Sequence, residues 1–319
     1  MKSPVSLIDL HCDTLSEICH KNASLLQNDF AISLETVEPF DHYAQFFASW
    51  CSRRLNDDDG YAAFLQMADY LDAQLADPEI AKRAIKVKTA DELDQAWQQG
   101  KAAAILAIED ARILGGQIER LDELASRGVR YATLQWGGDT CIGGAHDTEN
   151  PLTPFGKDVV RRCFALGIVP DISHTCKQSA QDALDLAVHY EKPVIASHSN
   201  SYTVYPHTRN LRDEHFGIIR DLGGLVGLNF YRAHLRDCSE QNATVSDLVR
   251  HLEYFLSLGG ENTVAIGGDW DGAQLPDGFS NIADVRILQD ELLRLGYDNE
   301  LIDKLFWKNA YDFIHRAFI

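Results

Sequence analysis

The chain alternates short apolar runs with helical segments throughout its length, and this alternation most narrows the folds open to it. The apolar runs have the length of buried parallel strands, and the segments between them carry apolar residues at helical spacing. Eight strands are expected, at residues 5–10, 45–50, 102–108, 130–135, 168–173, 193–197, 224–229 and 263–267. A strand and helix unit repeated in this way predicts an α/β fold, the TIM-type (β/α)8 barrel, whose active site gathers at the carboxyl ends of the strands.

The length suits one domain, because single barrels of this type commonly run to about 250 residues or more. We therefore expect residues 1–319 to form a single catalytic barrel domain with C-terminal helices. A loop at 136–154, rich in glycine, aspartate and threonine, is expected to cover the active site. Helices are expected at residues 61–75, 89–100, 118–126, 155–166, 179–190, 213–222, 245–258, 284–295 and 299–318.

Composition excludes several classes of partner. The net charge is -19 at pH 7 with no basic block to offset it, so neither nucleic acid nor an anionic membrane surface is expected to bind. No apolar run approaches the ~20 residues that span a bilayer, and we expect no signal segment before the first strand. The seven cysteines are odd in number and lack CxxC spacing, which argues against a disulfide framework. We expect a cytoplasmic protein. A homodimer is also expected, because homodimers are common among soluble enzymes.

His11 and Asp13 lie at the end of the first predicted strand. Residues two apart on a strand point to the same side, so this imidazole and carboxylate would form half of a metal site. The alternative is that Asp13 caps a helix beginning near Thr14 while His11 is a hydrogen-bonded core histidine. The pair taken alone favours that alternative.

Other predicted strands also end at a histidine or a carboxylate residue. In a barrel these strand ends converge on one mouth. Three histidines and three carboxylates without cysteine suit zinc or a similar divalent metal, and they are numerous enough for two ions. Such a site would stabilise a developing oxyanion and make hydroxide available near neutral pH. One ion would be held by His11 and Asp13 and the other by His174 and His198, with Glu109 bridging and Asp269 beside them.

Each of these residues also has a purely structural interpretation. Glu109 could pair with Arg112, and His174 and His198 could cap helices or satisfy buried backbone groups. Asp269 and Asp271 could be turn residues. The coincidence of all of them at strand ends favours the metal site. Five further histidines are expected on the surface: His20, His42, His189, His251 and His315.

The ordered set of motifs resembles the membrane (renal) dipeptidases, peptidase family M19 of the amidohydrolase superfamily. The resemblance covers nearly the whole chain and rests on residues 8–13, 107–109, 171–174, 197–199, 208–210, 228–231 and 267–272. It implies two zinc ions on the ligands given above. It also implies that Arg209 receives the carboxylate at the substrate's C-terminus, since a guanidinium donates two parallel hydrogen bonds. Asp269 would match the family's proton-transfer aspartate, and Asp9 matches without an assigned role.

The resemblance fails at one position. Well-known family members carry a histidine soon after the fourth strand that contacts the substrate or the tetrahedral oxyanion, whereas this chain has Gln135-Trp136-Gly137. Trp136, placed at this substrate-binding position, cannot donate as an imidazolium would. Three explanations stay open: His146 reaches back from the loop, metal alone holds the oxyanion, or the substrate differs.

The sequence therefore predicts a binuclear zinc dipeptidase. It would hydrolyse short dipeptides, including those with a C-terminal D-amino acid, through a metal-bridging hydroxide. One alternative is a related amidohydrolase that acts on a non-peptide amide, lactone or ester. Another is a catalytically silent metal- or peptide-binding relative, and the presence of Asp269 argues against it, because a binding protein needs no proton carrier.

Overall fold

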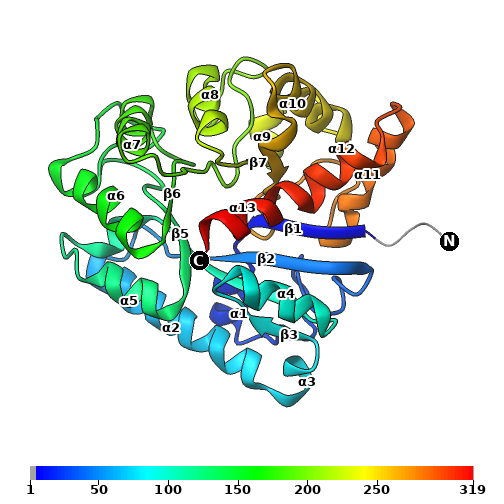
Figure 1. Cartoon of the computed structure of the whole chain (residues 1–319), viewed down its shortest axis with the longest axis horizontal. Coiled ribbons are helices and arrows are strands. Elements are labelled where there is room, and N and C mark those ends of the chain that lie inside the picture. The colour runs from blue at the N-terminus through cyan, green and yellow to red at the C-terminus, as the bar shows by residue number, and fades with distance from the viewer. Residues whose placement is uncertain (1–4, 319) are drawn as a thin grey trace.

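Parallel strands form the centre of the molecule (Figure 1). The computed structural model describes residues 5–318. Along the sheet the strands follow the order β6-β5-β4-β2-β1-β8-β7, and every pairing is parallel. The strands are β1 (Val5–Cys12), β2 (Phe40–Trp50), β3 (Ala84–Lys86), β4 (Ala102–Glu109), β5 (Val129–Thr133), β6 (Val169–Asp171), β7 (Val226–Leu228) and β8 (Val264–Ile266).

The barrel closes through a segment that is too short to count as a strand. Ile195 pairs with Asp171 of β6, and Ala196 pairs with Val226 of β7, each through an isolated parallel bridge. The prediction of a TIM-type barrel is confirmed, but the sixth strand expected at 193–197 is reduced to these two bridges. Pro193 explains part of this reduction, because proline has no N–H to give to a ladder. The sequence also gave no sign of β3, which pairs with the first three residues of β4.

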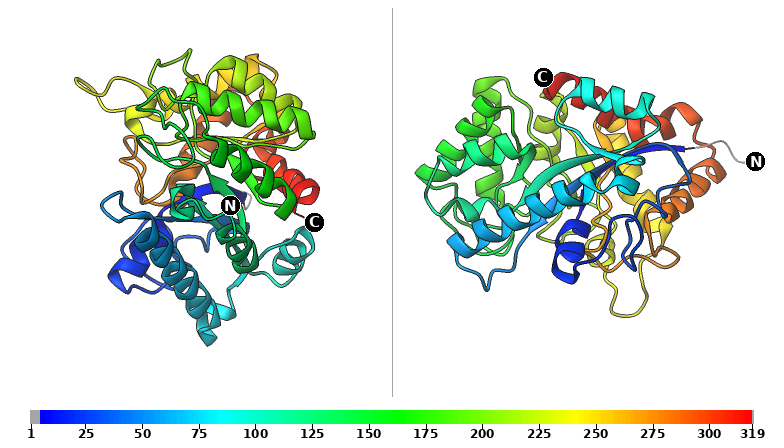
Figure 2. Two further views of the ribbon diagram at one scale, coloured as in Figure 1. Left: turned by 90° about the vertical axis from the view of Figure 1, so that its left-hand side faces the viewer. Right: turned by 90° about the horizontal axis from the view of Figure 1, so that it is seen from below.

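The helices lie around the outside of the strands (Figure 2). The expected helix at 299–318 is interrupted by a π-helical turn, Lys304–Lys308. The capping box at Thr89 and Glu92 is present. The helices are α1 (Thr14–Lys21), α2 (Asp57–Ala76), α3 (Pro78–Ala81), α4 (Ala90–Gln98), α5 (Arg120–Arg127), α6 (Pro154–Leu166), α7 (Lys177–Tyr190), α8 (Asp213–Asp221), α9 (Arg232–Leu235), α10 (Val245–Ser257), α11 (Val285–Arg294), α12 (Asn299–Asp303) and α13 (Asn309–Ala317). Of the described helices, none is long and apolar enough to cross a membrane.

Strand β4 shows how the sequence positions the site. Side chains alternate between the two faces of a strand. Ala103, Ile105 and Ala107 pack in the inner cluster with residues of β1 and β2, whereas Leu106 and Ile108 pack in the outer cluster. Glu109 continues the inner series, so its carboxylate projects into the mouth of the barrel.

Candidate metal centre and active site

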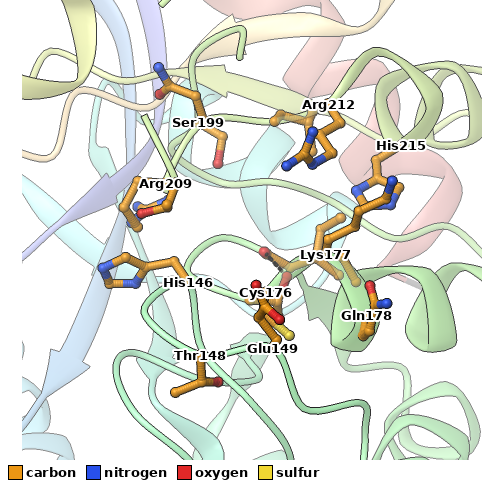
Figure 3. Close-up of a pocket in the computed structure, with 16 residues that line it drawn as sticks. His146, Thr148, Glu149, Cys176, Lys177, Gln178, Ser199, Arg209, Arg212 and His215 are labelled. Atoms are coloured by element: carbon orange, nitrogen blue, oxygen red, sulfur yellow. Dashed lines mark hydrogen bonds between the residues drawn. The ribbon is translucent and has the colours of Figure 1, made fainter. Parts of the chain in front are cut away.

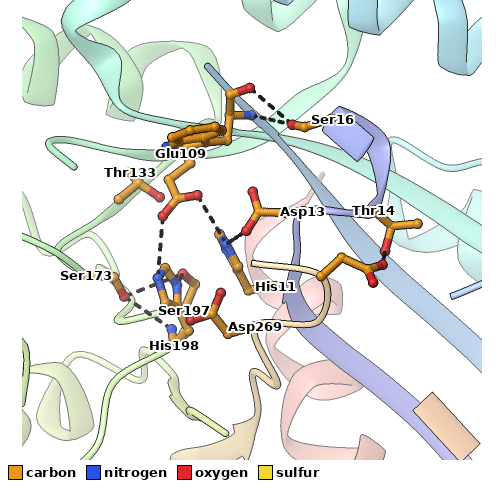
Figure 4. Close-up of polar contacts among 12 residues, drawn as sticks. His11, Asp13, Thr14, Ser16, Glu109, Thr133, Ser173, Ser197, His198 and Asp269 are labelled. Atoms are coloured by element: carbon orange, nitrogen blue, oxygen red, sulfur yellow. Dashed lines mark hydrogen bonds and ion pairs between the residues drawn. The ribbon is translucent and has the colours of Figure 1, made fainter. Parts of the chain in front are cut away.

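The six residues that the sequence predicts as metal ligands or proton carrier come together at the carboxyl-terminal edge of the barrel, and Figure 4 labels five of them. Five are at least nine-tenths buried, and the His174 side chain is 11% exposed. They come from the ends of β1, β4, β6 and β8 and from the bridged segment at 195–196. The residues are His11, Asp13, Glu109, His174, His198 and Asp269.

The Glu109 carboxylate lies at the centre of the group. Its Oε1 is 2.9 Å from His174 Nε2 and 3.6 Å from His198 Nε2. Its other oxygen, Oε2, is 3.4 Å from His11 Nε2, which in turn is 3.8 Å from Asp13 Oδ2. One carboxylate therefore faces two separate sets of potential ligands, one on each oxygen.

Asp269 adjoins the His11 side of the group. One ligand atom each from His11, Asp13 and Asp269 lie within 4.8 Å of one another. Asp269 and His174 both have a positive φ, +59° and +68°, which non-glycine residues rarely adopt. Strained backbone of this kind clusters at functional sites, where the surrounding structure fixes it.

Hydrogen bonds orient the imidazoles of His11 and His198. Tyr131 donates its hydroxyl proton to the Leu10 carbonyl (2.9 Å), so it accepts from His11 Nδ1 (2.8 Å). Likewise the Ser197 hydroxyl donates to an Asp171 carboxylate oxygen (2.6 Å) and accepts from His198 Nδ1 (2.8 Å). In both rings the hydrogen bond holds a proton on Nδ1 and directs Nε2 toward the centre.

His174 is oriented in the same way. Its Nδ1 donates to the Trp136 carbonyl (3.0 Å), and its Nε2 lies 2.9 Å from His198 Nε2. Burial lowers the pKa of both imidazoles well below the usual value, so both are neutral. Two nitrogen lone pairs at this distance repel each other unless a cation lies beside them.

The carboxylates of the centre lie buried and close to one another. Burial, together with the charge of Asp13, raises the pKa of Glu109 to about 8, and burial raises the pKa of Asp269. His11 Nε2 and Asp13 Oδ1 are buried and have no hydrogen-bond partner among the described residues. Buried polar atoms are nearly always paired, so this donor set fits divalent metal ions.

The structure does not support the alternatives for Glu109 and Asp13. Arg112 pairs with Asp110 (3.1 Å) and Asp57 (3.2 Å) and leaves Glu109 free. Asp13 does precede α1, but its side chain makes no capping hydrogen bond. Both carboxylates are therefore available to the centre.

Of the other structural interpretations, the structure excludes one and supports another. The N-cap of α7 is Cys176, which excludes His174 from that role. Asp271 is a structural turn residue, since it accepts from Thr14 Oγ1 (2.6 Å) and from the Ala31 N–H (2.7 Å). The surface assignment of His251 is wrong: the ring is buried on α10 and hydrogen-bonded through both nitrogens.

Arg209 lies beside the centre and is 5% exposed. Its Nη2 donates to the His198 carbonyl (3.2 Å), while Nε and Nη1 have no partner among residues 5–318. Burial lowers its pKa to about 10, so the guanidinium stays charged at neutral pH. A buried cation with two unpartnered nitrogens is suited to a carboxylate.

His146 approaches the centre from the long loop. Its backbone N–H donates to the His174 carbonyl (2.6 Å), and the two rings lie 5.6 Å apart. Burial, followed by the charge of Arg209, lowers its pKa to about 4, so the ring is neutral. Its Nδ1 is buried without a hydrogen-bond partner in the described chain.

Trp136 forms a wall of the site. Its ring stacks on His174 at 6.0 Å between centroids and meets Trp50 edge to face at 5.4 Å. Trp136 is partly exposed, and its carbonyl orients His174. It therefore contributes an apolar surface and a ligand-orienting carbonyl at the position where the sequence departs from the family.

A family model described as membrane dipeptidase, peptidase family M19, matches residues 1–317. The chain belongs to this family. A member of this family is a metallo-dipeptidase, a hydrolase acting on peptide bonds, and the solved relatives described below share the fold of this chain.

Three relatives illustrate the range of this dipeptidase family. A metallo peptidase from Rhodobacter sphaeroides, solved with a phosphinate mimic of the dipeptide L-Ala-D-Ala, is 25% identical with a TM-score of 0.90 and covers 99% of this chain and 100% of that one. Dipeptidase AC, a metallo peptidase of family M19, is 26% identical with a TM-score of 0.91 over 99% of both chains. An uncharacterised protein from Klebsiella pneumoniae is 32% identical over 69% of this chain and 84% of its own.

Several supporting residues of this dipeptidase-family site were not predicted. Asn229 donates to Asp269 Oδ2 (3.1 Å) and to the His198 carbonyl (3.3 Å). Asp9, whose role the sequence left open, accepts from the backbone of His11 and from the Trp270 indole (both 2.9 Å), which ties the end of β1 to the loop after β8. The sequence does contain a signal for the role of Asp9. An aspartate side chain can accept a hydrogen bond from the backbone N–H two residues later, here that of His11.

Tyr131→Phe should weaken metal binding about 10- to 100-fold, because it removes the acceptor that fixes His11. Competition with a chromophoric chelator would measure the change. Tyr70→Phe is a matched control, since that hydroxyl donates to Ala23, away from the barrel mouth. Equal affinities in the two variants would contradict the orienting role of Tyr131.

Gly272→Ala should lower the metal content, because a Cβ there would lie 1.9 Å from Asp13 Oδ2 and 2.7 Å from Asp269 Oδ1. Elemental analysis after gel filtration would measure it. Gly217→Ala on α8 is the control, since its Cβ would meet nothing within 4 Å. Full metal content in folded Gly272→Ala would show that these carboxylates do not form part of the centre.

Proposed function

We propose that this chain is a binuclear, zinc-dependent dipeptidase. The observation that carries the proposal is the Glu109 carboxylate, which faces His174 and His198 with one oxygen and His11 with the other. His11 and Asp13 would hold one ion, His174 and His198 the other, and Glu109 both. Bound there, the ions would polarise the scissile carbonyl and lower the pKa of water.

Arg209 would bind the carboxylate at the C-terminus of the substrate. Its Nε and Nη1 have no partner among residues 5–318, so the buried guanidinium keeps N–H groups free to donate to a carboxylate. Because the guanidinium also contacts the His198 carbonyl, the anchored carboxylate lies close to the proposed ligands. This short separation favours a dipeptide over a longer peptide.

Asp269 would carry the proton. Asn229 holds its Oδ2, and the carboxyl lies within 4.8 Å of the ligand atoms of His11 and Asp13. Burial raises the pKa of Asp269. A raised pKa suits a carboxylate that takes a proton from the attacking water and delivers it to the leaving amine.

His146 would replace the histidine that other family members carry after the fourth strand. Its neutral ring lies beside His174, and its Nδ1 has no partner among the described residues. From this position the ring can hydrogen-bond the substrate's peptide oxygen or its carboxylate. Trp136 would contact the substrate through its apolar face.

The relative solved with the L-Ala-D-Ala mimic supports dipeptides with a C-terminal D-residue as candidate substrates. The test is a panel of L-Xaa-L-Xaa and L-Xaa-D-Xaa dipeptides, run beside lactones, esters and non-peptide amides. Turnover confined to dipeptides is the expected result. Turnover of lactones or esters alone would replace the dipeptidase assignment with another amidohydrolase activity.

A further inference from the structure

A cavity of about 320 Å³ adjoins the proposed active site on the far side of Arg209 and His146 (Figure 3). It lies between the long loop after β5, the N-terminus of α7 and the segment that leads into α8. In Figure 3 Arg209 and His146 lie on one side of it, and Arg212 and His215 lie on the other. A ligand held by Arg209 therefore has open space beyond the guanidinium.

Three well-buried polar residues line this cavity, and each also has a side-chain atom without a partner among the described residues. Arg209 is 5% exposed with Nε and Nη1 free, Asn210 is 6% exposed with Oδ1 free, and His215 is 3% exposed with Nε2 free. Leaving a buried polar group unpaired is unfavourable. Their presence around one cavity points to a polar ligand.

The charge of the lining favours an anion. Arg212 is half-buried with its guanidinium 4.2 Å above the Tyr202 ring, and no described acidic side chain forms an ion pair with it. Lys177 also lines the cavity but is partly neutralised by Glu214 at 3.3 Å. Glu149 is an exposed lining residue and the one carboxylate among them.

The N-terminus of α7 adds to the positive electrostatic potential of the cavity. The helix has 14 residues, and its first two, Lys177 and Gln178, line the cavity. The Cys176 side chain caps the Ser179 N–H, which leaves earlier N–H groups of the first turn without that cap. A helix N-terminus carries partial positive charge and favours an anionic group nearby.

We propose that this cavity takes the side chain of the C-terminal residue of a dipeptide and selects an acidic one, aspartate or glutamate. The inference rests on the proposed function, in which Arg209 binds the main-chain carboxylate. The side chain that branches from the adjoining carbon then enters the cavity, and its carboxylate meets Arg212. Charge-assisted hydrogen bonds of this kind are stronger than neutral ones, so the matching amide side chain is bound less well.

The test compares isosteric pairs of substrates: L-Ala-Glu with L-Ala-Gln and L-Ala-Asp with L-Ala-Asn, each with the second residue in L and D form. We expect kcat/KM for the acidic member to exceed that of its amide by about tenfold or more. Arg212→Gln should lower this ratio about tenfold, and Arg212→Lys should keep part of it. Arg220→Gln is the matched control, since Arg220 lies on α8, the helix that Arg212 precedes as its N-cap, and pairs with Asp221 instead.

An acid to amide ratio of one or below in the wild-type enzyme would overturn the inference, as would a ratio that Arg212→Gln leaves unchanged. The panel also separates this inference from the proposed function. Hydrolysis of L-Ala-L-Ala or L-Ala-D-Ala without a preference for an acidic C-terminal residue would contradict only the role proposed for the cavity. Hydrolysis of no dipeptide by the metal-loaded protein removes both.

Discussion

Asp269→Asn should lower kcat by about 10²- to 10⁴-fold, the range for loss of a positioned general acid or base. Asparagine has the same shape but cannot take a proton from the attacking water. KM should change little, because Arg209 provides the anchor. Steady-state kinetics on a dipeptide, with metal content determined on the same sample, would measure the effect.

Asp271→Asn is the matched control for Asp269→Asn. The two aspartates lie two residues apart in the loop after β8 and share a positive φ, +59° and +65°. Asp271 bonds to Thr14 and Ala31 instead of facing the centre, so its replacement should cost less than tenfold in kcat. Retention of more than a tenth of kcat in metal-loaded Asp269→Asn would contradict the proton-transfer role.

Arg209→Ala should act mainly through KM and lower kcat/KM about 30-fold or more. Truncating one partner of a buried charge pair costs about 2–5 kcal/mol, partly because the substrate carboxylate is then buried without a partner. Arg209→Lys should recover only part of the loss, since an ammonium cannot donate in the forked geometry. The separate effects on KM and kcat distinguish an anchoring role from a general loss of structure.

Dipeptide amides supply an internal control for Arg209. Wild-type enzyme should discriminate strongly against a dipeptide whose C-terminal carboxylate is converted to an amide. Arg209→Ala should lose that discrimination, because it lacks the guanidinium that binds the carboxylate. A variant that still rejects the amide as the wild type does would show that another residue binds the carboxylate.

The proposed ligand set could be predicted because each member follows an apolar strand, and the alternation along β4 alone points Glu109 inward with Ala107. The supporting groups could not. Tyr131 lies within β5, and its bond to His11 joins residues 120 positions apart. Sequence periodicity reports which face a residue occupies, but it does not report which distant side chain it meets.

Other differences have local causes. Pro193 weakened the expected sixth strand, and the helix at 299–318 contains a π-helical turn that apolar spacing does not reveal. Its place on a helix, away from the strand ends, predicts His251 at the surface, although Leu248 and Leu252 on α10 show that it lies on the buried face. Arg209 shows no local pattern, and only the family resemblance identified it before the structure showed its burial.

The most direct test of the central claim is metal titration of the apoprotein, with bound metal and dipeptide turnover followed together. Zinc and cobalt should each bind to two equivalents per chain, and hydrolysis of L-Ala-D-Ala or L-Ala-L-Ala should reach its maximum only as the second equivalent binds. Full turnover at one equivalent would contradict the binuclear centre around Glu109. Two bound equivalents without hydrolysis of any dipeptide would contradict the dipeptidase.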